Sequence, residues 1–173
     1  MAIIQSYGLF WTPDDVHWGR GSQAGQLLGI PSRAKRTEPI DFRDQVGIYV
    51  LYLNEKIVYV GQAGAKNAKL FGRLKKHRKD ILQNRWNRFS WFGLRRVLNN
   101  GELSTEKKGT QATLGSALNH IEAVLIASAE PNLNKQGGRF GRGSTRYLQV
   151  RDDRLGPTEA EMVRELWEKR QVR

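Results

Sequence analysis

The chain has 173 residues, no cysteine and a net charge of +12, with 39% hydrophobic and 27% charged residues. This composition predicts one folded domain, and no run approaches the ~18 apolar residues that a membrane span needs. Without cysteine there can be no disulfide, thiolate zinc site or cysteine nucleophile, so any metal must be held by oxygen or imidazole. The N-terminus lacks a secretory pattern, and we expect a cytoplasmic protein.

The positive charge is concentrated in one part of the chain. Residues 66–108 contain thirteen Lys and Arg against three Asp and Glu, whereas residues 1–45 and 150–173 are each balanced. A surface built for solubility would mix both signs, so this concentration predicts a polyanionic partner. We expect nucleic acid, with duplex DNA as the first expectation and RNA as the alternative, and the sequence leaves a homodimer open.

Residues 1–45 are predicted to form an N-terminal extension that packs on the core. Its aromatic residues include Trp11 and Trp18. Such rings can stack on bases, but the neutral charge of the segment favours a structural cap or an oligomer contact.

Two β-rich runs, 46–53 and 56–60, flank the pair Asn54-Glu55 and predict a hairpin with a two-residue loop. Tyr49 and Tyr59 then become neighbours across a small antiparallel sheet. Residues 88–94 alternate aromatic residues between two faces and are the predicted third strand.

Residues 68–84 have the apolar periodicity of a helix, with Leu70, Leu74 and Ile81 on one stripe. Arg73 and His77 lie one turn apart beside that stripe. Arg73 is either another exposed cation or a side chain directed at the sheet, and its position favours the second interpretation.

A second helix is predicted at 111–129, with Glu122 inside an otherwise apolar run. A buried carboxylate is costly unless a cation or hydrogen-bond donors meet it, so Glu122 is either a metal ligand or the partner of an arginine. After it come Pro131-Asn132-Leu133-Asn134 and a Gly/Arg loop at 137–143, which is either a linker or a contact to nucleic acid backbone. Residues 157–170 predict a terminal helix whose Met162, Leu166 and Trp167 pack inward.

The ordered set of Gly-Ile-Tyr, Tyr-Val-Gly, a helical Arg with His one turn later, a helical Glu and Pro-x-x-Asn resembles the GIY-YIG nuclease family. The resemblance covers about half of the chain. Its motif positions are Tyr49, Tyr59, Arg73, His77, Glu122 and Asn134. Gln62 stands where the excision-repair branch typically has Lys, so the resemblance is closer to the restriction and homing enzymes.

The resemblance implies an α+β fold with a small three-stranded antiparallel sheet flanked by helices, and one Mg²⁺ or Mn²⁺ ion held by Glu122. It implies a nuclease core at 46–149, preceded by the extension 1–45 and followed by a C-terminal helix in 150–173. Arg73 would contact the scissile phosphate, with His77 and Asn134 supporting the site. Either tyrosine can serve as the general base, and the expected central strand favours Tyr49, with Tyr59 holding phosphate.

The function expected from this pattern is metal-dependent endonucleolytic hydrolysis of DNA. The alternative is a basic module on the same fold that binds DNA or RNA without cleaving it. In either case the predicted nucleic-acid contacts are Lys69, Lys75, Lys76, Lys79, Arg139 and Arg142.

Overall fold

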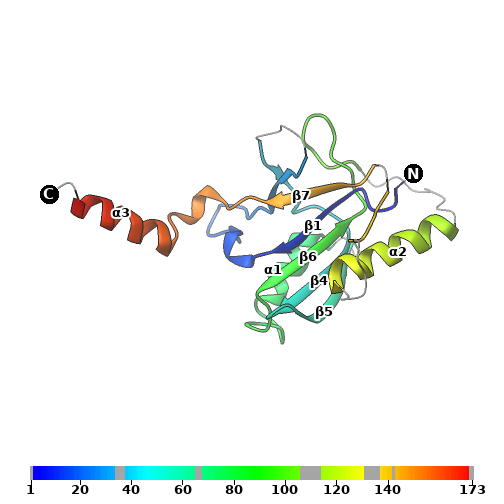
Figure 1. Ribbon diagram of the computed structural model, residues 1–173, viewed down its shortest axis with the longest axis horizontal. Helices are drawn as coiled ribbons and strands as arrows, with labels where there is room; N and C mark the ends of the chain where they lie inside the picture. The colour runs from blue at the N-terminus through cyan, green and yellow to red at the C-terminus, as the bar shows by residue number, and fades with distance from the viewer. Residues whose placement is uncertain are drawn as a thin grey trace.

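The computed structural model describes residues 2–33, 38–64, 68–105, 114–130, 137–141 and 143–171 (Figure 1). The strands are β1 (Ser6–Trp11), β2 (Leu28–Pro31), β3 (Ile40–Asp41), β4 (Gly47–Leu53), β5 (Lys56–Ala63), β6 (Arg88–Gly93) and β7 (Thr145–Gln149). The α-helices are α1 (Leu70–His77), α2 (Leu114–Ala129) and α3 (Glu159–Gln171). Short 3-10 turns lie at Pro13–Asp15 and Asp153–Leu155.

All of these strands belong to one seven-stranded sheet in the order β3-β2-β7-β1-β6-β4-β5. The pair β1 and β7 is parallel, and the other neighbouring pairs are antiparallel. The predicted three-stranded antiparallel sheet is therefore wrong, because β6, β4 and β5 form only one end of a mixed sheet. The reason is that β6 has a second edge of unpaired backbone groups, and β1 occupies that edge with Tyr7 opposite Phe92.

The predicted hairpin is confirmed as β4 and β5. Leu53 pairs with Lys56, which leaves Asn54 and Glu55 as the two-residue loop. Both loop residues have positive φ, 49° and 68°. This is the backbone conformation of the two-residue turns whose twist matches that of the flanking strands. The third predicted strand is also confirmed, as β6.

The helix after the hairpin is shorter than predicted, because α1 ends at His77. Leu70 and Leu74 are buried as expected, but Ile81 is 85% exposed and does not belong to the apolar stripe. The chain turns away where Oδ1 of Asp80 accepts a hydrogen bond from the backbone N–H of Leu82. Such a local side-chain bond competes with helix continuation.

The alternation of β4 gives the sheet two packed faces. Tyr49 and Leu51 pack in one cluster with the α1 residues Leu70 and Leu74. The alternate β4 residues, Val50 and Tyr52, point to the other face and pack in a second cluster with Ala123 and Ala127 of α2. Helices α1 and α2 therefore cover opposite faces, and Figure 1 shows α1 behind the sheet and α2 in front of it.

Helix α3 projects from the body of the molecule instead of packing on it (Figure 1). The prediction that Met162, Leu166 and Trp167 pack inward is wrong, because these side chains are 45%, 66% and 66% exposed. In the part of the chain that the structure describes, no helix combines the length and hydropathy of a membrane span.

Candidate active site

A hydrogen-bonded chain of four side chains lies on the α1 face of the sheet. The hydroxyl of Tyr49 is 2.8 Å from Nε2 of His77, and Nε of Arg73 donates to the same hydroxyl over 3.3 Å. Nδ1 of His77 is 2.8 Å from Oδ2 of Asp80. One phenol thus contacts a guanidinium on one side and an imidazole–carboxylate pair on the other.

Local structure accounts for this meeting. Tyr49 lies in β4 with its ring on the side that α1 covers, and Arg73 and His77 are one helical turn apart in α1. Gly61 is the β5 partner of Tyr49. A Cβ atom at Gly61 would overlap the Tyr49 ring and hydroxyl, so this glycine is needed for the close approach of the tyrosine to β5.

The hydrogen-bond partners assign the protons of the chain. The pKa of Asp80 is held below its ordinary value mainly by the hydrogen bond from the backbone N–H of Leu82, and the hydrogen bond from His77 lowers it further. The ionised carboxylate can only accept, so Nδ1 of His77 carries the proton and donates it. In the neutral imidazole Nε2 then keeps a lone pair, which can accept the O–H of Tyr49.

The two tyrosines differ in their environment. Tyr49 is fully buried, and burial raises its pKa although the contact with Arg73 opposes the shift. Tyr59 is only half-buried, with its ring centroid 4.8 Å from that of His77 and 6.1 Å from that of Tyr49. Arg73 is also half-buried. Tyr59 and Arg73 thus reach solvent, as does Asp80, whereas Tyr49 and His77 are buried.

Four of the six residues in the predicted site therefore lie together: Tyr49, Tyr59, Arg73 and His77. Asn134 lies outside the described residues.

Glu122 does not join the other predicted site residues. Its side chain is exposed on the outward face of α2, beside Leu118 and Leu125, which are 57% and 60% exposed. Helix α2 covers the sheet face opposite to the one that holds Tyr49. The apolar run around Glu122 suggested burial, but the residues that face the sheet are Ala123 and Ala127.

The predicted metal site does not fit this arrangement. Glu122 would have to supply its carboxylate beside Tyr49, and it is on the other side of the sheet. Over the described ranges, no group of three or more His, Asp or Glu could hold an ion elsewhere.

Asp80 is the member of the site that the sequence analysis missed. It follows His77 by three residues, a spacing that brings the two side chains together at the end of a helix. The pattern His-x-x-Asp beside an apolar stripe was the available signal.

The predicted nucleic-acid contacts fall into two groups. Lys76, Lys79 and Arg139 are exposed. Lys69 and Lys75 are half-buried, and Nζ of Lys75 lies 5.7 Å from the centre of the Phe71 ring. Arg142 lies outside the described residues.

A further cation beside these contacts was not among the predicted ones. The guanidinium of Arg78 lies over the ring of Trp18, 4.8 Å from its centre, and Trp18 stacks on Phe71. Basic side chains thus surround α1, and two of them rest on aromatic rings.

Comparison of the chain with protein-family models, with curated proteins and with solved structures found no match. The function must therefore be argued from the chemistry of the site itself.

Proposed function

We propose that the protein hydrolyses phosphodiester bonds in nucleic acid, with duplex DNA as the expected substrate. The observation that carries this proposal is the Tyr49 hydroxyl, held between His77 and Arg73 at 2.8 and 3.3 Å beside a basic helix. Phosphodiester hydrolysis needs an activated water and a cation facing the negative charge of the transition state. This group of side chains offers both. The order of motifs that resembles the GIY-YIG nucleases supports the same reaction.

Arg73 is the residue that we assign to the scissile phosphate. Its Nε is engaged by Tyr49, which fixes the plane of the guanidinium. Tyr59 is a second hydrogen-bond partner of the same guanidinium. A planar fork matches two phosphate oxygens better than an ammonium does. Tyr49 would therefore act through Arg73 as a positioning residue. This role suits its full burial.

Tyr59 is the residue that we assign to the attacking water. It is half-buried where Tyr49 is fully buried, so a water molecule can reach it. Its hydroxyl would orient the water and accept a proton from it while passing its own proton to Tyr49, whose hydroxyl proton moves to Nε2 of His77, as the water oxygen bonds to phosphorus. The bond from phosphorus to the departing sugar oxygen then breaks, and that oxygen takes a proton from solvent.

His77 and Asp80 complete the proposed mechanism. With its Nδ1 proton donated to Asp80, His77 offers Nε2 as a proton acceptor behind the tyrosines. A proton that enters the tyrosine pair from water can move toward this nitrogen. This arrangement follows the general logic of an acid–base group that is oriented by a third residue.

The proposed mechanism uses side chains alone, because Glu122 does not fit a Mg²⁺ or Mn²⁺ site beside Tyr49. The same position of Glu122 favours a second candidate function, a basic module that binds nucleic acid without cleaving it. Binding needs the cations around α1 but not a carboxylate near Tyr49.

The deciding experiment compares wild type, Arg73→Lys and Arg85→Lys on supercoiled DNA and on RNA, with Mg²⁺ and with EDTA. Arg85 is an exposed arginine after α1 and provides the matched control. Cleavage that is lost in Arg73→Lys and kept in Arg85→Lys, with binding unchanged in both, supports the nuclease. Binding without cleavage of either nucleic acid under both conditions supports the binding module instead.

A further inference from the structure

Helix α3 has no buried side chain in its described positions. Residues 159–170 are all exposed, although they include the four large apolar side chains Met162, Val163, Leu166 and Trp167. A helix of thirteen residues is marginal in water without tertiary packing. Local support consists of reciprocal capping hydrogen bonds between Thr158 and Glu161 at its start and an exposed ion pair between Glu165 and Lys169.

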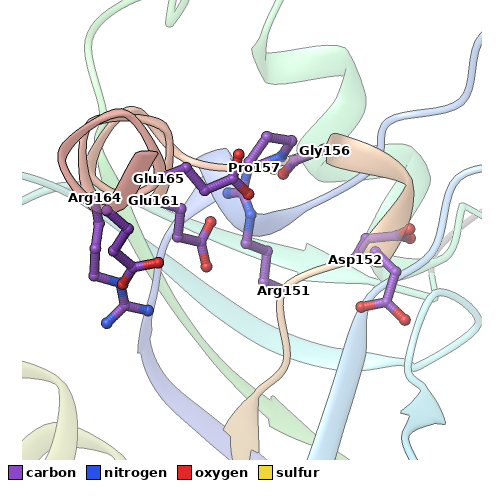
Figure 2. A pocket seen from close by; sticks show the side chains of 9 residues that line it. Arg151, Asp152, Gly156, Pro157, Glu161, Arg164 and Glu165 are labelled. Carbon is purple, nitrogen blue, oxygen red and sulfur yellow. Dashed lines mark hydrogen bonds between the residues drawn. The ribbon is translucent and has the colours of Figure 1, made fainter. Parts of the chain in front are cut away.

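The polar side of α3 faces the segment that precedes it. The hollow beside the segment 151–157 is lined on the α3 side by charged residues alone: Glu161, Arg164, Glu165 and Glu168. Figure 2 shows Glu161 beside Arg151. The apolar side of α3 is directed away from this segment, and its side chains are exposed.

The apolar stripe is symmetric about the midpoint between Arg164 and Glu165. Met162 and Trp167 are equally far from this midpoint, and so are Val163 and Leu166. Two oppositely charged residues, Glu159 and Arg170, lie on the same stripe and are also equally far from the midpoint, because helical positions i, i+4, i+7 and i+11 share one face.

This symmetry makes the stripe complementary to itself in the antiparallel direction. When two copies of α3 cross head to tail, Trp167 faces Met162 of the other copy, and Leu166 faces Val163. Glu159 faces Arg170 at one end and Arg170 faces Glu159 at the other. A parallel pair would instead set Glu159 against Glu159, and like charges in contact are unfavourable.

We propose that α3 is a homodimerisation helix, and that two copies of this chain associate through an antiparallel α3 pair. The occupant of the apolar stripe is thus the same stripe of a second copy, related by a two-fold axis. The contact is short, since thirteen residues span about 20 Å. It belongs to the small class of interfaces, and we expect a dimer that dissociates in the micromolar range.

The test exchanges charges in the full-length chain and measures its mass by sedimentation equilibrium over a range of concentrations. Glu159→Arg and Arg170→Glu each place like charges at both ends of the antiparallel pair. Each single variant should dimerise about tenfold more weakly than wild type. The double variant Glu159→Arg/Arg170→Glu restores opposite charges and should regain dimerisation. An equimolar mixture of the two single variants should also form heterodimers.

The double variant separates pairing from helix stability. Arg near the start of a helix and Glu near its end both oppose the helix dipole, so the double variant should be the least helical monomer. Recovery of the dimer in this variant can therefore come only from the charge pair.

Two outcomes would overturn the proposal. The first is a chain that stays monomeric at all concentrations. The second is a dimer on which the four charge combinations have no effect, because another surface would then cover α3. The exposed face of α2 around Leu118, Ile121 and Leu125 is such a surface, and Leu125→Asp would then weaken the dimer. Cleavage plays no part in this readout, so it stands apart from the proposed nuclease activity.

Discussion

The hydroxyl of Tyr49 lies 2.8 Å from Nε2 of His77, inside the face of the sheet that α1 covers. His77 is itself 4% exposed, and its other ring nitrogen is held by Asp80. Neither ring can turn without breaking a hydrogen bond in a buried place, which costs about 1–3 kcal/mol for each group left unpaired. The pair is thus a rigid support for Arg73 and Tyr59, which are both partly exposed to solvent.

The tyrosines should separate by role when each is replaced by Phe. Tyr59→Phe removes the hydroxyl that contacts water, and we expect single-turnover cleavage to fall by about a hundredfold or more. Tyr49→Phe removes the hydrogen bonds to Arg73 and His77 but no group that contacts the water, and it should slow cleavage by roughly tenfold. Rates measured across pH test this prediction. If Tyr49→Phe is the inactive variant and Tyr59→Phe is merely slow, the two assignments must be exchanged.

Gly61→Ala should damage the site through packing. The added methyl group meets the Tyr49 ring and hydroxyl, and a well-packed core loses about 1–3 kcal/mol in unfolding free energy from such an insertion. Gly72→Ala is the matched control, because no atom lies within 4 Å of the added Cβ and the helix gains about 0.5–1 kcal/mol. Urea titration of both variants measures the difference. Equal stabilities would show that Tyr49 can move aside without cost.

Nucleic-acid affinity should depend on the exposed cations of α1 and the turn after it. Replacing Lys76 and Lys79 by Gln should lower the slope of log K against log salt by about 0.9 for each phosphate that the variant no longer neutralises. Lys56→Gln is the control, since Lys56 is exposed at the far end of the hairpin. Fluorescence anisotropy at several salt concentrations gives the slopes. A slope that changes only in the control would assign the binding surface to the hairpin.

Glu122→Gln should leave cleavage within about threefold of wild type at saturating Mg²⁺, because Glu122 lies across the sheet from Tyr49. Glu130→Gln, at the exposed end of the same helix, controls for a general change of charge. Initial rates over a Mg²⁺ titration make the measurement. Loss of cleavage in Glu122→Gln alone, reversed by a large excess of the ion, would instead identify Glu122 as a metal ligand.

Stability in acid should depend on Asp152, a buried carboxylate that accepts hydrogen bonds from Arg154. These bonds hold the pKa of Asp152 below the ordinary 3.8. A lowered pKa in the folded state stabilises the protein above the unfolded value, and this contribution disappears as the pH falls through the folded one. Asp152→Asn should therefore lower the thermal midpoint at neutral pH, and this difference from wild type should shrink as the pH falls below 3.8. A difference that stays the same across this pH range would assign the effect to packing.

The parts of the fold that the sequence predicted are those with a local cause. The hairpin follows from two β-rich runs around a polar pair, and β6 follows from alternating aromatic residues. The grouping of Arg73 with His77 follows from the period of the helix, and the two tyrosines follow from the pairing of adjacent strands. Each of these relationships spans few residues, so periodicity alone is sufficient to indicate it.

The parts that only the tertiary structure decided depend on contacts between distant segments. The width of the sheet was not predictable, because β1 and β7 are short and join it through partners more than fifty residues away. The sequence did not predict which side of α2 packs on the sheet, because an apolar run does not indicate which of its residues will face the sheet. The place of Asp80 in the site depends on where α1 ends. That end is set by the turn after His77, in which Asp80 accepts a hydrogen bond from the backbone N–H of Leu82.

The sequence by itself thus predicted most of the candidate side chains and determined which of them are near neighbours along a helix or across a hairpin. The tertiary structure alone decided that Tyr49 is buried while Tyr59 reaches solvent, that Glu122 lies on the opposite face, and that α3 stands free of the core. The physical reason is that local periodicity fixes the face of a strand or helix on which a residue lies, whereas burial depends on which distant segment covers that face.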